Sequence, residues 1–138
     1  MNALLASRTA RPIQVEFGLS EADCVVLTEL TQSAADDGWM LISELVGCLG
    51  WEKSRLSHQL SRMEKRGLVV RKEYADDRRT ALVAATYEGR SVIAEATPRQ
   101  AEEVRRLFLD HLSPAQVVLL TEIAERIIEE VRAASETP

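Results

Sequence analysis

Cysteine and histidine are scarce in this sequence. The two cysteines, Cys24 and Cys48, are too few for a secreted disulfide scaffold and lack the CxxC spacing of a zinc site. The two histidines, His58 and His111, stand alone, so their spacing supports neither a metal site nor a base–nucleophile pair. We therefore expect no metal and no cofactor.

Long apolar runs are also missing. No uncharged stretch approaches the 18 or so residues that a membrane span needs. The first residues, MNALLASRTARP, hold only a short apolar start, with no hydrophobic region of signal-peptide length. A chain of 138 residues suits one domain that buries about two-thirds of its unfolded surface. These features predict a soluble, cytoplasmic, single-domain protein.

The motifs of common enzyme classes are absent as well. The sequence contains no G-x-S-x-G, P-loop, HExxH or Rossmann glycine pattern. The acid pairs Asp36-Asp37 and Asp76-Asp77 fall in predicted loops, where solvated turn residues are the rule. We predict that the protein is not an enzyme.

Positive charge is unevenly distributed along the chain. The whole chain has a formal net charge of −5, which by itself disfavours nucleic acid as a partner. The window from Lys53 to Arg79, however, holds nine basic and four acidic residues, so it carries +5 while the other 111 residues carry −10. A local basic surface on an acidic body is what a DNA-binding protein with one binding face requires.

Two short helices are predicted in the first half of the chain. The first covers residues 19–31 and begins with a capping box formed by Ser20 and Asp23. Within residues 40–50 a short extended segment precedes a second helix, which we expect Ser43 to cap.

A third helix, over residues 51–67, separates apolar from polar side chains. Leu56, Leu60 and Met63 share one stripe, the predicted core face. The opposite face contains small hydroxyls, one imidazole and several cations, with no acid: Ser54, Arg55, Ser57, His58, Ser61, Arg62 and Lys65.

The second half begins with a predicted hairpin and continues with helices. Residues 68–87 contain two β-branched-rich runs around a polar tip. Helix signals resume at Thr86, and Pro98 is expected to kink or restart that helix. Ser113 and Gln116 mark the start of the last helix, which is apolar beyond one stripe and is predicted to be buried on more than one side.

This order of elements predicts a mainly α fold with a small β-hairpin wing, a winged helix-turn-helix with a helical dimerisation region. A cationic helix fits the major groove, and the hairpin tip can reach an adjacent minor groove. Asp77 and Arg79 can lie on one side of an extended strand, where the acid would orient the cation. The candidate DNA-binding residues are Lys53, Ser54, Arg55, Ser57, His58, Ser61, Arg62, Asp77, Arg78 and Arg79.

Three segments together resemble the multiple antibiotic resistance regulator (MarR) family of winged-helix transcription factors. They are SRLSHQLSRMEKRGLVVR (54–71), DDRRTALVAATYEGR (76–90) and TPRQAEEVRRLFLDHLSPAQ (97–116). The resemblance implies a homodimeric regulator, more often a repressor, on a palindromic operator in double-stranded DNA, relieved by a small molecule or by oxidation. It places a DNA-binding lobe at 20–87 and a dimerisation region at 1–19 and 88–138.

The sequence departs from this family before residue 19. Family members usually carry a full first helix there, whereas here only MNALLASRTARPIQVEFG precedes Leu19. We expect Pro12 to interrupt any helix across this segment, so that the chain starts inside the family's first helix and part of the usual dimer interface is absent.

Two alternative functions remain open from the sequence. The first is a winged-helix protein-interaction module that no longer binds DNA. The second is a redox-sensing regulator that uses Cys24 or Cys48, although Cys24 lies among apolar helix positions typical of a small core residue. Trp51 is expected to pack under the start of the third helix and Trp39 to border a cleft.

Overall fold

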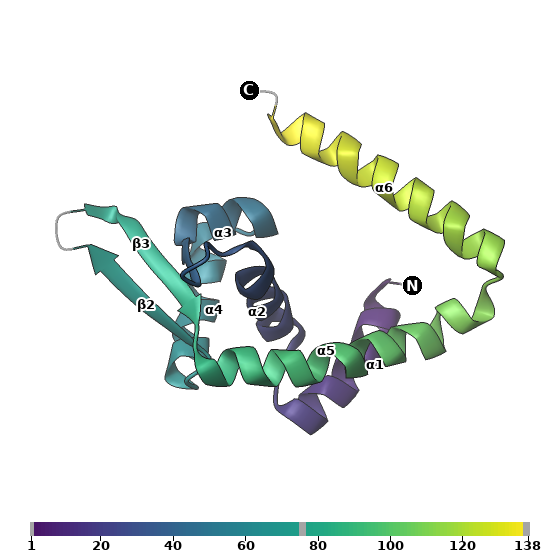
Figure 1. Cartoon of the computed structure of the whole chain (residues 1–138), viewed down its shortest axis with the longest axis horizontal. Coiled ribbons are helices and arrows are strands. Elements are labelled where there is room, and N and C mark those ends of the chain that lie inside the picture. The colour runs from purple at the N-terminus through teal and green to yellow at the C-terminus, as the bar shows by residue number, and fades with distance from the viewer. Residues whose placement is uncertain (1, 75–76, 137–138) are drawn as a thin grey trace. The chain divides into compact units, whose positions relative to one another are not determined.

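The computed structural model describes the backbone of residues 2–74 and 77–136, and the side chains of residues 8, 10–73 and 81–134. It is mainly helical with a small antiparallel sheet, which confirms the predicted fold class (Figure 1). The chain forms two compact units, Met1–Gln100 and Ala101–Pro138. The elements are α1 (Asn2–Phe17), α2 (Glu21–Ser33), β1 (Trp39–Leu41), α3 (Ile42–Leu49), α4 (Lys53–Lys65), β2 (Val69–Tyr74), β3 (Asp77–Ala85), α5 (Tyr87–Leu107), the 3-10 turn η1 (Leu109–His111) and α6 (Pro114–Glu136).

The capping prediction is confirmed for α2 and wrong for α3. At the start of α2, the Asp23 amide donates to Ser20 Oγ at 3.1 Å, and the Ser20 amide donates to the Asp23 carboxylate at 2.9 Å. Ser43 caps nothing, because α3 already begins at Ile42. The pairing of β1 with β3 continues to Leu41, which leaves no separate residue for a side-chain cap.

The core face of α4 is the predicted one. Leu56, Leu60 and Met63 are all fully buried. The helix ends at Gly67, whose φ of 74° lies in the left-handed region that glycine adopts without strain. The Leu68 amide then donates to the Met63 carbonyl at 3.0 Å, which satisfies a carbonyl of the last turn and folds Leu68 onto the core.

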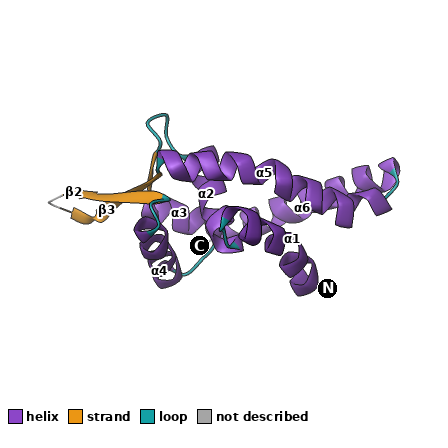
Figure 2. Cartoon of the chain, turned by 90° about the horizontal axis from the view of Figure 1, so that it is seen from below, coloured by secondary structure: helices purple, strands orange, loops and turns teal. Residues whose placement is uncertain are grey.

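The sheet has three antiparallel strands in the order β1-β3-β2. β2 and β3 form the predicted hairpin, paired from Val69–Ala85 at its base to Tyr74–Asp77 at its far end. The hairpin extends beyond the helices that surround its base, as a wing does (Figure 2).

The junction between the hairpin and α5 depends on Thr86 and Gly89. Thr86 Oγ1 accepts from the Gly89 amide at 3.0 Å and donates to the Gly67 carbonyl at 2.6 Å. A Cβ at Gly89 would lie 2.1 Å from the Leu68 carbonyl oxygen, so any larger residue would force the backbones apart. This contact explains why a glycine stands three residues after the threonine.

Neither Pro12 nor Pro98 interrupts its helix, which corrects the break expected at Pro12 and the restart expected at Pro98. α1 is one helix from Asn2 to Phe17, and α5 is one helix from Tyr87 to Leu107. A proline inside a helix costs about 3 kcal/mol through a lost hydrogen bond and a clash. Ile13, next to Pro12, is 1% exposed, so tertiary packing offsets this cost in α1.

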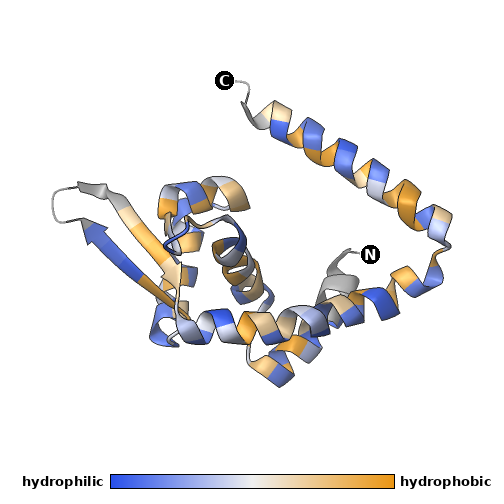
Figure 3. Ribbon diagram, in the orientation of Figure 1, coloured by the Kyte–Doolittle hydropathy of each residue, from blue (hydrophilic) through white to orange (hydrophobic). Residues whose placement is uncertain are grey.

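α6 begins as predicted but is not buried within the chain. The Ser113 amide donates to Gln116 Oε1 at 2.9 Å, and the Gln116 amide donates to Ser113 Oγ at 3.2 Å. Hydrophobic residues recur along the whole of α6 (Figure 3). Seven of its large aliphatic side chains are 39–60% exposed: Val118, Leu119, Leu120, Ile123, Ile127, Ile128 and Val131.

Candidate nucleic-acid interface

The solvent side of α4 is polar and cationic along its length. The helix core face fixes which side chains point outward, because residues three and four apart share a face. Ser61 is half-buried, and six other side chains are exposed: Ser54, Arg55, Ser57, His58, Arg62 and Lys65. Lys53, the first residue of α4, is exposed as well. The structure thus brings all the predicted α4 residues onto one accessible surface.

Arg55 is held by an aromatic ring. Its guanidinium carbon lies 4.0 Å from the centroid of the Trp51 ring, a cation–π contact. Trp51 itself is half-buried against the hydrophobic core, as expected from the sequence. The ring therefore gives the Arg55 cation a fixed support at the start of α4.

Arg71 on β2 connects the hairpin to α4. Its guanidinium donates to Glu64 at 3.0 Å and to Ser61 Oγ at 3.2 Å, and its amide donates to Glu64 at 3.1 Å. These bonds, the side-chain one first, hold the pKa of the Glu64 carboxyl below its ordinary value. Glu64, the one acid within Lys53–Lys65, is therefore paired with a wing residue.

A cleft of about 430 Å³ lies between α4 and the hairpin. Lys53 and Ser57 line it from α4, and Arg71 and Lys72 line it from β2. The Lys72 ammonium also lies 3.9 Å from the ring centroid of Trp39, which ties β1 to β2. Two acids, Glu64 and Glu73, also line the cleft, so its three cations exceed its acids by one.

Arg62 is bonded to a buried polar group beneath α4. Its guanidinium donates to Gln59 Oε1 at 2.7 Å, and Gln59 Nε2 donates to the Asp23 carboxylate at 2.6 Å. Arg66 donates to the same carboxylate at 2.6 Å. Asp23 is 1% exposed and Gln59 is 4% exposed, so this network is part of the core.

The predicted wing residues lie at the start of β3. The first three residues of β3 are Asp77, Arg78 and Arg79, and Asp77 pairs with Tyr74 across the hairpin. The side chains of these three residues lie outside the described residues. Their predicted contact with a minor groove stays a prediction.

Residues 20–89 match the family of winged-helix DNA-binding domains. Over 96% of this chain and 87% of the other, the structure resembles AbsC, a MarR family transcriptional regulator from Streptomyces coelicolor, at 32% identity and a TM-score of 0.81. The chain belongs to the MarR family.

Two further relatives match different shares of this MarR-family chain. Sco3205, a MarR family transcriptional regulator from Streptomyces coelicolor solved in complex with DNA, is 29% identical with a TM-score of 0.81, over 94% of this chain and 80% of that one. Transcriptional regulator HosA of Escherichia coli O127:H6 (strain E2348/69 / EPEC) is 37% identical over 76 residues. That match spans 55% of this chain and only 56% of HosA.

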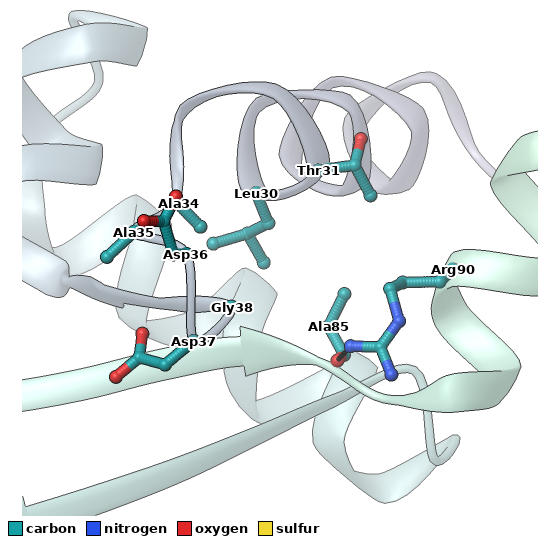
Figure 4. A pocket seen from close by; sticks show the side chains of 9 residues that line it. All are labelled: Leu30, Thr31, Ala34, Ala35, Asp36, Asp37, Gly38, Ala85 and Arg90. Atoms are coloured by element: carbon teal, nitrogen blue, oxygen red, sulfur yellow. Dashed lines mark hydrogen bonds between the residues drawn. The ribbon is translucent and has the colours of Figure 1, made fainter.

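A second cleft of this MarR-family chain lies away from α4. It measures about 350 Å³ and is lined from the end of α2, the turn before β1, the end of β3 and the start of α5. Leu30 and Ala85 border it, and the Arg90 guanidinium reaches across it and donates to the Ala85 carbonyl at 2.9 Å (Figure 4). Asp36 and Asp37 line the turn side.

The two cysteines have properties that argue against redox sensing. Cys24 is buried, as expected for a core residue, and burial raises its pKa to about 11. Cys48 is exposed, but partial desolvation and the nearby Glu29 raise its pKa as well. Because the thiolate is the reactive form, neither environment activates a thiol.

The described part of the chain has neither a metal-binding cluster nor a membrane-spanning helix. No group of three or more His, Cys, Asp and Glu side chains there could hold a metal ion. No described helix is both long enough and apolar enough to cross a membrane.

Sequence reasoning missed three residues that shape this surface. In the sequence, Gln59 resembles its polar neighbours, Arg66 adds only to the basic residues of the window from Lys53 to Arg79, and Asp23 shows only its part in the capping box. A signal was present, because Gln59 falls between Leu56, Leu60 and Met63 on the buried side and so needs hydrogen-bond partners there.

Proposed function

We propose that this MarR-family chain is a sequence-specific double-stranded DNA-binding transcriptional regulator. The observation that carries the proposal is the exposed face of α4, where cations and hydroxyls stand without an unpaired acid. The side chains of such a helix can donate hydrogen bonds to purine acceptors in a major groove and to the phosphates along its edges. The winged-helix family match over residues 20–89 and the DNA complex of Sco3205 support the same function.

The residues proposed to contact DNA are those of α4 and the wing. Arginine and lysine would bind purine edges and phosphates, while serine and His58 would bind either. On the wing, Arg79 would enter the minor groove with Asp77 orienting it, and Arg78 would meet phosphate. The set is Lys53, Ser54, Arg55, Ser57, His58, Ser61, Arg62, Asp77, Arg78 and Arg79.

We propose further that the regulator is a homodimeric repressor. Aliphatic side chains are exposed along α6, and monomeric proteins rarely expose large apolar patches. This exposure supports a dimer in which a second copy of the chain packs against α6. In this arrangement residues 20–87 form the DNA-binding lobe, and residues 1–19 and 88–138 form the dimerisation region. Two copies of α4 would then meet successive major grooves of a palindromic operator, about one helical turn apart.

A small-molecule effector that releases the repressor completes the proposal. The two clefts, of about 430 and about 350 Å³, have room for a small ligand. One of them adjoins α4, so a ligand there would compete directly with DNA.

Fluorescence anisotropy with the DNA upstream of the protein's own gene, against scrambled DNA, tests the function. Preferential binding is expected, with log K falling by about 0.9 per neutralised phosphate as log salt rises. Arg79→Ala should weaken operator binding by about 1–3 kcal/mol per arm. Equal, weak binding to both DNAs by a chain of dimeric mass would favour the protein-interaction alternative.

A further inference from the structure

A relay of hydrogen bonds runs from the start of α2 to the outer face of α4. Ser20 and Arg66 donate to one oxygen of the Asp23 carboxylate, and Gln59 donates to the other. The opposite end of the Gln59 amide accepts from Arg62. Each bond is 2.6–2.9 Å long.

The direction of these bonds is fixed by Asp23. A carboxylate only accepts, so the amide of Gln59 must present its Nε2 to Asp23 and its Oε1 to the other side. That oxygen needs a donor because Gln59 is 4% exposed. Arg62 supplies it, and its guanidinium is thereby held at one position on an otherwise solvent-exposed side chain.

The bond to Gln59 uses one of the five N–H groups of the planar Arg62 guanidinium. The remaining donors can meet a phosphate or a purine edge, and the arginine has lost part of its rotamer freedom before DNA arrives. Ordering a long side chain in advance lowers the entropy cost of binding. The buried Gln59 thus orders the Arg62 side chain before it contacts DNA.

Arg66 joins the relay to the end of α1. One of its guanidinium nitrogens donates to Asp23 and another donates to the Gly18 carbonyl, in the turn between α1 and α2. The Asp23 carboxylate is thus held by the backbone at the start of α2 and by Gln59 and Arg66, and Arg66 also bonds the turn that follows α1.

We propose that Asp23 and Gln59 are positioning residues for DNA recognition, which act by holding the Arg62 guanidinium through the direction of their hydrogen bonds. This inference rests on the DNA-binding function proposed above. It concerns residues that do not themselves meet DNA.

Reversing the direction of the relay tests the proposal. In Asp23→Asn, the amide oxygen is expected to stay with Ser20 and Arg66, so its Nδ2 faces Gln59 Nε2, donor against donor. In Gln59→Glu, two carboxyl groups face each other, and their repulsion should displace the Glu side chain together with the Arg62 guanidinium that it accepts from. Each single variant should weaken operator binding by about tenfold, the size of one lost side-chain contact. The double variant D23N/Q59E restores a donor opposite an acceptor and should return to within about threefold of wild type.

The same variants in an Arg62→Ala background separate positioning from folding. If Asp23 and Gln59 act through Arg62, their substitutions should change operator affinity there by no more than about twofold. Thermal unfolding of every variant shows whether it is folded. Gln32→Glu, at an exposed position outside both clefts, makes the same chemical change as Gln59→Glu and should leave affinity unchanged.

Gln59→Met provides a second route if Asp23→Asn does not fold. It removes both bonds of Gln59 and leaves Asp23 with Ser20 and Arg66. The inference is overturned if folded single variants bind operator like wild type, if the double variant fails to recover, or if the losses persist without Arg62. Absence of any operator preference in the wild-type protein would instead overturn the proposed function itself.

Discussion

α4 and α6 expose opposite kinds of surface. α4 buries its apolar residues and presents cations whose positions are set by partners in the same chain: Trp51 beneath Arg55, and Gln59 beside Arg62. α6 exposes its aliphatic residues, and Ile127 is 58% exposed. The proposed DNA-binding face of α4 is therefore formed within one chain, while the apolar side of α6 is proposed to need a second copy.

A glutamate on the apolar side of α6 should have the largest consequence. Ile127→Glu places a charge where a second copy is proposed to lie, so the dimer should dissociate. Operator affinity should then fall by about 100-fold or more, because the two half-sites no longer act together. Sedimentation measures the mass of the protein in solution, and fluorescence anisotropy measures its affinity for operator DNA. Arg132→Glu, on the polar side of the same helix, is the control and should remain dimeric.

Gly89→Ala should destabilise the chain by about 3 kcal/mol, the upper range for overpacking. The new Cβ would meet the Leu68 carbonyl oxygen at 2.1 Å and push the hairpin base away from α5. Urea unfolding followed by circular dichroism measures the loss. Gly47→Ala, in α3 with nothing within 4 Å of its Cβ, is the matched control. Equal stability of both variants would contradict the described contact.

Removal of the ring under Arg55 should have a smaller effect on DNA binding. Trp51→Leu should weaken operator affinity by about two- to fivefold, the value of an exposed cation–π contact. In an Arg55→Ala background the same change should have no further effect on affinity. A persistent loss in that background would show that Trp51 acts on DNA binding through another route.

Glu64 should give a small dependence of stability on acid pH. Its folded pKa is lowered, so its bonds with Arg71 stabilise the fold above the unfolded pKa of about 4.5 and are lost as pH falls through the folded value. Glu64→Gln should therefore lose less stability than wild type in this acidic range. Thermal unfolding between pH 3 and about 6 measures the difference. Glu95→Gln, an exposed carboxyl on α5, is the control.

Local sequence signals predicted the elements that local chemistry determines. Ser20 and Asp23 mark the start of α2, Ser113 and Gln116 that of α6, and Gly67 the end of α4, each through bonds within a few residues. The winged helix-turn-helix followed from their order.

Tertiary contacts account for what sequence reasoning missed. Pro12 disfavours a helix locally, yet packing around Ile13 preserves α1. The Gln59–Asp23 bond joins residues 36 apart, so no local pattern announces it. Ser43 failed as a cap because strand pairing decided where α3 begins.

Selection of bound sequences from a random DNA pool tests the central claim most directly. A homodimer with a prepared recognition helix should enrich an inverted repeat whose half-sites lie about 10 base pairs apart. The enriched DNA should lose its advantage with Arg62→Ala. If a chain of confirmed dimeric mass enriches no sequence, the account of α4 as a reader of operator DNA is wrong.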